Sequence, residues 1–311
     1  MSRLAALGAL PRRPLLPLTS LKVGGPADWL LRTSEREHAI AALQMAVDEG
    51  LPVTFLGGGS NLLVSDAGVE GLVLKPMFAR VQMLVDRDQA VLYAEAGQSF
   101  SALARRLAHQ GWAGLEWAVS VPGTIGGAVV NNAGAFGGAC QDVLLSVDVV
   151  DAEGRLRELD PAALAYRYRY SRLKERELGL LLVVGARFAL RRADPHLLRQ
   201  TVQRLQDQRT LTQPRQQSAG SVFTNPEGDY AGRLVEAAGL KGATIGKAQV
   251  SPQHANFIVT FPGATAADVY ALIVLMQEEV WRQHRVWLRP EIQLVGRWSE
   301  AERRRLEAPL A

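Results

Sequence analysis

Two glycine-rich segments in the N-terminal half restrict the possible fold more than any other feature of this sequence. The first, Gly57-Gly58-Gly59-Ser60-Asn61, follows an apolar segment at 52–56 that is expected to be a strand. Consecutive glycines let backbone N–H groups converge on an anion that any Cβ would hold away. The segment lacks the Lys-Ser/Thr ending of a P-loop and the G-x-G-x-x-G spacing of a Rossmann helix. We therefore interpret it as a phosphate-binding loop of another fold, with an ordinary tight turn as the alternative.

The second segment, VPGTIGGAVVNNAGAFGG at 121–138, is uncharged and glycine-dense within a region that otherwise alternates helix and strand. Long loops kept inside compact domains tend to be functional. Together the two segments predict a dinucleotide site in which a pyrophosphate lies between the loops; a glycine-rich packing seam is the alternative. The residues expected to bind the cofactor are Gly57, Gly58, Gly59, Ser60, Asn61, Pro122, Gly123, Thr124, Gly126, Gly127, Asn132, Gly134 and Ala135.

Hydrophobic periodicity predicts alternating helices and strands along most of the chain. A capping box at Ser34–Glu37 is expected to start one helix, and Thr265, with Asp268 three positions later, to start the longest one. Residues 1–18 have no clear period and are expected to form a surface arm, and the charged tail at 299–311 is expected to fray. Further predicted elements are strands at 52–56, 71–74, 80–85, 90–94, 180–190 and 291–295, helices at 100–109 and 195–209, and a hairpin at 143–159.

Charge and cysteine content exclude several classes of function. The 311 residues carry a net charge of +4, but the arginines are spread along the chain, which disfavours a nucleic-acid partner. Cys140 is the single cysteine, which excludes an internal disulfide framework and favours a reducing compartment. The five histidines show no metal-ligand spacing, so no metal is predicted. No apolar run could span a bilayer, and Pro-Arg-Arg-Pro interrupts the apolar N-terminus, so we expect a cytoplasmic protein without membrane insertion.

Seven motifs extend in order from residue 18 to residue 296. They are LTSLKVGGPAD at 18–28, FLGGGSNLLVSDAGVEGLVL at 55–74, VPGTIGGAVVNNAGAFGG at 121–138, YRYSRLK at 168–174, AGSVFTNP at 219–226, HANFIV at 254–259 and RPEIQLVG at 289–296. In this order they resemble the UDP-N-acetylenolpyruvoylglucosamine reductase family, over nearly the whole chain. One glycine motif alone would indicate only the broader FAD-binding fold, whereas the ordered set is highly specific.

The resemblance implies an α+β protein, with a two-lobed FAD-binding fold of the PCMH or vanillyl-alcohol-oxidase type followed by an α/β substrate-binding lobe. The family reduces UDP-N-acetylglucosamine enolpyruvate to UDP-N-acetylmuramate for peptidoglycan, using non-covalent FAD and NADPH as reductant. The partners would then be NADPH and a UDP-sugar, and the chain a monomer or weak homodimer. The expected divisions are an N-terminal arm at 1–18, FAD-binding lobes at 19–78 and 79–192, a substrate-binding domain at 193–298 and a C-terminal tail at 299–311.

The resemblance also assigns three catalytic residues. Hydride from the flavin leaves negative charge on the inner carbon and carboxylate of the enolpyruvyl group, and stabilising that charge is the catalytic problem. Arg169, in the Y-R-x-S motif, would hold the carboxylate. Ser221, in G-S-x-F, would protonate the intermediate, and Glu291, in P-E, would polarise it or relay protons. Without the resemblance these residues would be interpreted as a surface arginine, a turn serine and a strand-end glutamate.

The sequence departs from the family at Thr224, where a lysine is common, so a phosphate contact expected there is either absent or supplied by Lys247 or Arg233. The join at 190–209 is short and has no tyrosine, which resembles the family's second type, without a tyrosine-bearing loop over the substrate. The expected substrate contacts are Tyr168, Asn225, Gln249, His254 and Asn256.

Two other functions compete with the reductase. An oxidase of the same fold could attach flavin covalently through Cys140, just beyond the second glycine segment. A nucleotide-binding regulatory module would keep the fold and lose catalytic residues, whereas Arg169, Ser221 and Glu291 are all of the required types.

Overall fold

The computed structural model describes residues 3–308, and the chain forms two compact units. The first unit consists of Met1–Leu10, Trp29–Gly58 and Gly71–Arg209, and the second of Pro11–Asp28, Gly59–Glu70 and Thr210–Ala311. Each unit is therefore assembled from segments far apart in the sequence. Residues 1–2 of the predicted arm and 309–311 of the predicted tail lie outside the described residues.

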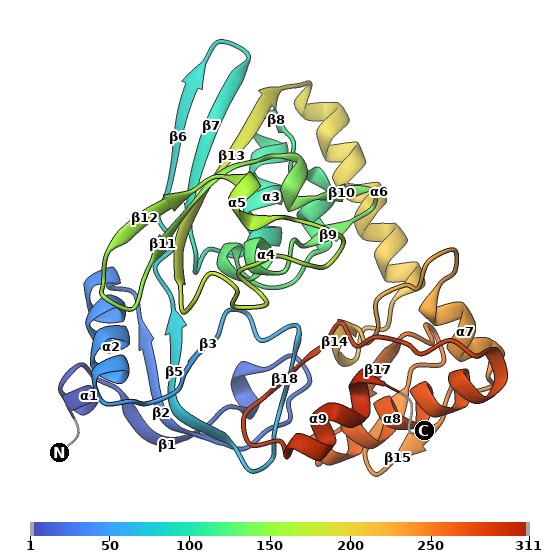
Figure 1. The fold of residues 1–311 in the computed structure, drawn as a ribbon. Coiled ribbons are helices and arrows are strands. Elements are labelled where there is room, and N and C mark those ends of the chain that lie inside the picture. Colours follow the sequence, from blue (N-terminus) through green and yellow to red (C-terminus); the bar gives the residue numbers. More distant parts are fainter. Residues whose placement is uncertain (1–2, 309–311) are drawn as a thin grey trace. The chain divides into compact units, whose positions relative to one another are not determined.

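The first unit is built on a six-stranded antiparallel sheet (Figure 1). Its main path has the order β12-β11-β13-β7-β6, and β8 pairs with one end of β13. The central β13 pairs with both neighbours, so that Gly185 lies opposite Glu95 on one side and Asp148 on the other. The strands are β6 (Val81–Asp86), β7 (Gln89–Glu95), β8 (Trp112–Ala113), β11 (Leu144–Val150), β12 (Leu156–Leu159) and β13 (Leu182–Arg192).

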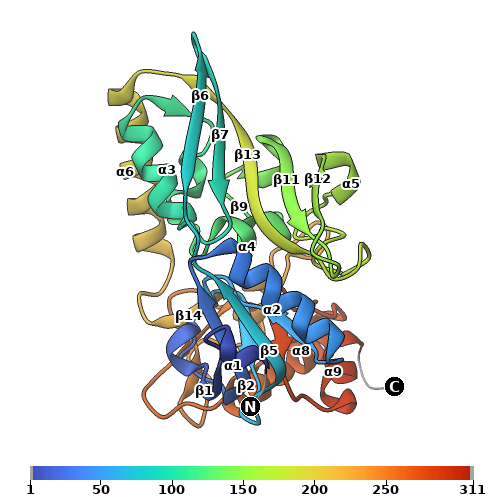
Figure 2. The same cartoon turned by 90° about the vertical axis from the view of Figure 1, so that its left-hand side faces the viewer.

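Helix α3 (Phe100–His109) lies against one face of this sheet (Figure 2). Ser99 caps its N-terminus by accepting from Ala102 N. Phe100 is fully buried and contacts the rings of Trp117 and Phe188, with centroids 5.5 and 6.3 Å away. Shorter elements of the unit are α1 (Arg3–Ala6), η2 (Glu116–Ser120), α4 (Ile125–Val130), β9 (Gly134–Ala135), β10 (Gly138–Ala139), η3 (Cys140–Asp142) and α5 (Pro161–Leu164).

A second sheet has the order β1-β2-β5-β3, in which β3 and β5 are parallel and Val53 lies opposite Leu72. Helix α2 (Arg36–Asp48) contributes Ala42, Leu43 and Ala46 to the core that contains these two residues. The chain passes between the units within three of these strands. The strands are β1 (Leu10–Pro14), β2 (Pro26–Thr33), β3 (Val53–Phe55) and β5 (Val69–Pro76).

The second unit contains a four-stranded antiparallel sheet of order β14-β17-β16-β15. The long helix α8 (Ala266–His284) packs on it through a core that includes Leu272, Met276 and Ile258. A two-stranded parallel ladder joins β4 to β18, with Leu62 opposite Gln293. The other elements are η1 (Leu16–Leu18), β4 (Leu62–Val64), β14 (Gln217–Ser221), α7 (Ala231–Ala237), β15 (Thr244–Ile245), β16 (Ala248–Val250), β17 (Phe257–Thr260), β18 (Gln293–Val295) and α9 (Glu300–Glu307); α6 (Pro195–Thr212) precedes β14.

The strands and helices that were given bounds from the sequence lie within a few residues of observed elements, but three other predictions were wrong. The N-cap of α2 is Glu35 without a side-chain cap, because the Thr33 hydroxyl takes the Glu35 N–H and Ser34 does not cap the helix. The expected arm contains α1, β1 and η1, and Leu15 within it is buried. The expected frayed tail contains α9, started by a capping box at Ser299. Within residues 3–308, no helix combines the length and apolar character needed to cross a membrane.

Candidate active site

The two glycine-rich segments touch within the first unit. A Cβ added at Gly58 would lie 2.5 Å from Gly123 Cα, and one at Gly57 would lie 2.8 Å from Thr124 Oγ1. Real Cβ atoms essentially never approach backbone this closely, so glycine is required at Gly58 for the two loops to meet. The result is a close backbone-to-backbone contact between Gly58 and Gly123 at the junction of the predicted cofactor loops.

Part of the second segment has a structural role as well. Gly126 N donates to Ala96 O and Ile125 N donates to Gln98 O, both at 2.9 Å, and a Cβ at Gly126 would contact the Ala96 side chain. These contacts fit the packing-seam alternative at this one position. The seam and the predicted cofactor surface would therefore be neighbouring parts of one loop.

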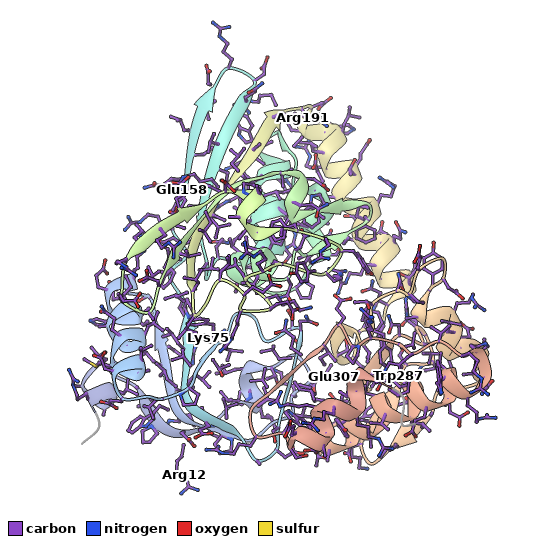
Figure 3. The ribbon with its side chains drawn as sticks, in the orientation of Figure 1. Arg12, Lys75, Glu158, Arg191, Trp287 and Glu307 are labelled. Carbon is purple, nitrogen blue, oxygen red and sulfur yellow. The ribbon has the colours of Figure 1, made fainter. Side chains whose placement is uncertain are left out.

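Lys75 is a residue near the first loop that the sequence prediction missed. It lies near the end of β5 (Figure 3), and its Nζ donates to the carbonyl oxygen of Gly57. Burial lowers the pKa of Lys75, and the nearby charge of Arg32 lowers it further. A lysine directly after the apolar strand predicted at 71–74 was the available signal, but its partner lies on a loop that only the fold brings close.

Arg169 is held beside the second glycine segment. Its Nη2 donates to Gly134 O at 2.9 Å, and Lys174 Nζ donates to Arg169 O at 3.0 Å. Asn132 ties the same two segments together, because its buried amide donates to Arg167 O at 2.9 Å. The neighbouring Arg167 instead places its guanidinium over the Tyr170 ring, 4.1 Å from the centroid.

Tyr168 and Cys140, two further residues of this unit, differ in their exposure. Tyr168 is exposed, and the Arg169 guanidinium lies 5.7 Å from its ring centroid. Cys140 is fully buried, and burial raises the pKa of its thiol to about 12. A thiol that is neither accessible nor ionised is a poor point of flavin attachment, which argues against the covalent oxidase.

In the second unit, Ser221 and Glu291 lie on adjoining backbone segments. Ser221 ends β14 opposite Phe257, and Glu291 N donates to the carbonyl of the next residue, Val222, at 2.8 Å. Asn61 joins this junction, because its Nδ2 donates to Glu291 O at 3.2 Å. The fold thus gathers one expected cofactor residue and two expected catalytic residues from three distant parts of the sequence.

Asn256 holds the segment that follows Ser221. Its side chain is 3% exposed, accepts from Phe223 N at 2.9 Å and donates to Phe223 O at 2.8 Å. Its backbone carbonyl accepts from Val222 N at 2.8 Å. The side-chain amide therefore fixes the backbone on the C-terminal side of Ser221. Because the hydrogen-bonded groups are buried, leaving them without partners would be costly.

The other expected substrate contacts also have local partners. His254 Nδ1 accepts from Asn256 N at 3.2 Å, and burial, together with the charge of Lys241, lowers the pKa of His254. Asn225 Oδ1 accepts from Ala231 N at 3.1 Å at the start of α7. Gln249 donates to Gly242 O at 3.2 Å.

At the position where the family often has lysine, Thr224 donates to Arg289 O at 3.3 Å. Arg233, one of the two cations considered as replacements, forms an ion pair with Asp229. Its Nε lies 2.6 Å from Asp229 Oδ1.

Comparison with known proteins gives the lineage of this chain. Residues 27–160 match the family model of an FAD binding domain, and residues 213–295 match that of the UDP-N-acetylenolpyruvoylglucosamine reductase C-terminal domain. The reductase of that name from Synechococcus sp. (strain JA-3-3Ab) is 44% identical over 92% of this chain and 91% of its own. The chain belongs to the UDP-N-acetylenolpyruvoylglucosamine reductase family. Another family member, from Chloroflexus aurantiacus, is 40% identical over 92% of this chain and 97% of its own.

A solved structure confirms the fold expected for the family. The crystal structure of the reductase from Thermus caldophilus has a TM-score of 0.77 and 33% sequence identity, covering 92% of this chain and 98% of that one. The predicted α+β class, with an FAD-binding fold of the PCMH or vanillyl-alcohol-oxidase type followed by a substrate-binding lobe, is confirmed. The resemblance read from the seven motifs is confirmed as well.

Proposed function

We propose that this chain catalyses the NADPH-dependent, FAD-mediated reduction of UDP-N-acetylglucosamine enolpyruvate to UDP-N-acetylmuramate in peptidoglycan precursor synthesis. The observation that carries the proposal is the junction holding Ser221 and Glu291, in a chain whose relatives are named as this reductase. Reduction of a carbon–carbon double bond needs one proton for every hydride. A hydroxyl and a carboxylate on adjoining segments suit delivery of that proton.

The first unit has a surface that suits FAD. Gly58 lies against Gly123 and Gly57 against Thr124, and the lack of Cβ atoms at such glycines would let a phosphate approach backbone N–H groups closely. These glycines, with Asn132 and Gly134 of the second segment, would hold the cofactor. When bound, FAD supplies hydride that originates on NADPH. Lys75 would keep the first loop in place through Gly57 O.

Each proposed catalytic residue has a role that its chemistry permits. Arg169 keeps a permanent charge and a planar donor fork, which suit a substrate carboxylate. Ser221 donates the proton, and it needs a water-poor surrounding because a serine hydroxyl is a weak acid in water. Glu291 polarises the intermediate or relays protons. The hydrogen bond from its backbone N–H to Val222 O supports its placement near Ser221. Tyr168, Asn225, Gln249, His254 and Asn256 remain proposed for the substrate side.

The proposal extends to the cellular setting. The enzyme would be cytoplasmic, with a UDP-sugar and NADPH as its small-molecule partners. It would neither bind nucleic acid nor insert into membranes. The predicted divisions at 19–78, 79–192 and 193–298 remain our proposed functional boundaries. The oligomeric state is proposed to be monomer or weak homodimer.

An anaerobic visible spectrum of the purified protein tests the proposal. Addition of NADPH should bleach the flavin band, and UDP-N-acetylglucosamine enolpyruvate should then restore it. A protein that shows no flavin band after reconstitution with FAD would refute the proposal. Recovery by O₂ alone, without response to the UDP-sugar, would favour the oxidase.

Replacing Ser221 by Ala separates the two half-reactions. We expect bleaching by NADPH at close to the unchanged rate, and recovery on adding the UDP-sugar slowed by about 10²-fold or more, the usual contribution of positioned acid catalysis. Stopped-flow absorbance measures both steps. Equal slowing of both steps would show that Ser221 does not act as the proton donor.

A further inference from the structure

Strand β6 is an unprotected edge of the large sheet in the first unit (Figure 1). Among the described residues 3–308, β7 is the one strand that pairs with it. Its apolar side chains are exposed: Leu84 by 75%, Val85 by 46% and Met83 by 37%. Proteins usually protect such an edge with an inward charge, a proline or a bulge, and residues 81–85 contain no charge and no proline.

The opposite edge of the same sheet provides a comparison. Strand β12 is also terminal, and it carries Arg157 and Glu158 between its two leucines. Leu156 is exposed by 59%, as expected at an edge, but the charges interrupt any continuous apolar row. Of the two terminal strands on the main path of this sheet, β6 is therefore the one without such protection.

The hydrogen bonding of β6 fixes which of its backbone groups point outward. Glu95 N donates to Arg80 O, so the backbone of Arg80 faces β7, as does that of every second residue after it. The N–H and C=O groups of Val81, Met83 and Val85 consequently face the open edge. Any strand added there must pair with these three residues.

Only a limited set of registers lets β6 pair antiparallel with a second β6. The register centred on Met83 places Met83 opposite itself and Val81 opposite Val85, so every outward-facing residue has an outward-facing partner. A shift by one residue along either chain would place outward-facing residues opposite inward-facing ones, and is therefore excluded. In the register centred on Met83, Arg80 lies opposite Asp86 of the second copy, and Asp86 opposite Arg80.

The charges at the two ends thus complement each other across a two-fold axis. Arg80 and Asp86 are both exposed and lie on the same face of β6. Opposite charges directly across an antiparallel pair attract, and an interface with two-fold symmetry repeats each pair twice. On the other face, Val81, Met83 and Val85 would extend the apolar row formed by Ala90, Leu92 and Ala94 of β7.

We propose that β6 is a self-association surface, on which a second copy of this chain adds its own β6 antiparallel in the register centred on Met83. The occupant is a second copy because both the parity of the outward groups and the charge pattern are self-complementary. The contact is short, so the dimer is a weak one that depends on protein concentration. None of its residues is among the catalytic residues proposed above.

Sedimentation equilibrium of the purified full-length chain tests this proposal. Met83→Lys places two like charges opposite each other at the two-fold axis and should weaken dimerisation at least about tenfold. Leu156→Lys, the same change on the other edge strand, should leave it unchanged. A chain that stays monomeric at its highest soluble concentration, or a dimer equally sensitive or insensitive to both changes, overturns the proposal.

Exchange of charges tests the register itself. Arg80→Asp alone and Asp86→Arg alone each place like charges opposite one another, so each variant should dimerise about tenfold more weakly than the parent chain. Mixing the two variants brings unlike charges together in both pairs, and a heterodimer should form at close to the parent affinity. Circular dichroism checks that each variant folds. Failure of the mixture to associate better than its components, or growth beyond dimers, contradicts the proposed register.

Discussion

At the scale of single residues, Asn256 shows how a buried polar side chain can hold the backbone beside a proposed catalytic residue, Ser221. Asn256→Ala would leave Phe223 N and O, both buried, without their side-chain partners. We expect the free energy of unfolding to fall by about 2 kcal/mol, within the usual range for an unsatisfied buried group. Urea denaturation measures this change. Asn225→Ala removes one bond at an exposed position and should cost less than half as much.

The same residue shows what the sequence could and could not predict about the site. Asn256 was expected as a substrate contact because of its motif, and its partner Phe223 lies more than thirty positions away. The pairing depends on the register between β14 and β17, which no local pattern indicates. Lys75 was missed for the same reason, since its partner Gly57 is on another segment. Residue types were readable from the sequence, but their partners were not.

At the scale of elements, α8 begins with a complete capping box. Thr265 accepts from Asp268 N at 3.0 Å, and Asp268 accepts from Thr265 N at 3.0 Å. Thr265→Ala should lower the free energy of unfolding by about 1 kcal/mol, the usual cost of losing an N-cap. Thermal unfolding followed by circular dichroism measures it. Ser34→Ala, at the position wrongly expected to cap α2, should have no measurable effect, and an equal loss would contradict this account.

The contrast between these two helices explains why capping patterns predict unevenly. Both have a hydroxyl followed three residues later by an acid. At α2 the preceding Thr33 takes the first backbone N–H, and the helix begins one residue later than expected. At α8 the Asp66 carboxylate also accepts from Ala266 N and Ala267 N, which favours the predicted start. Local patterns therefore predict a helix well, and its first residue only when no neighbour competes.

At the scale of the whole molecule, FAD binding and folding should be linked through the glycine junction of the first unit. A ligand that binds only the folded chain stabilises it by about 2.7 kcal/mol when present at one hundred times its dissociation constant. The parent protein should therefore unfold at a temperature that rises with FAD concentration. In Gly58→Ala the unfolding temperature should no longer rise with FAD. It should also be lower than that of the parent chain without FAD, because the new Cβ would meet Gly123 Cα at 2.5 Å.

Gly127→Ala is the matched control, because a Cβ there would find its nearest neighbour, Thr124 Oγ1, at an ordinary 3.8 Å. This variant should therefore fold with the stability of the parent chain when FAD is absent. If FAD raises its unfolding temperature normally, Gly127 lies away from the cofactor. If the rise is lost while stability without FAD is kept, the second glycine segment contacts FAD directly at this residue. Normal FAD binding by Gly58→Ala would instead show that the close approach of the two loops is not needed for the cofactor.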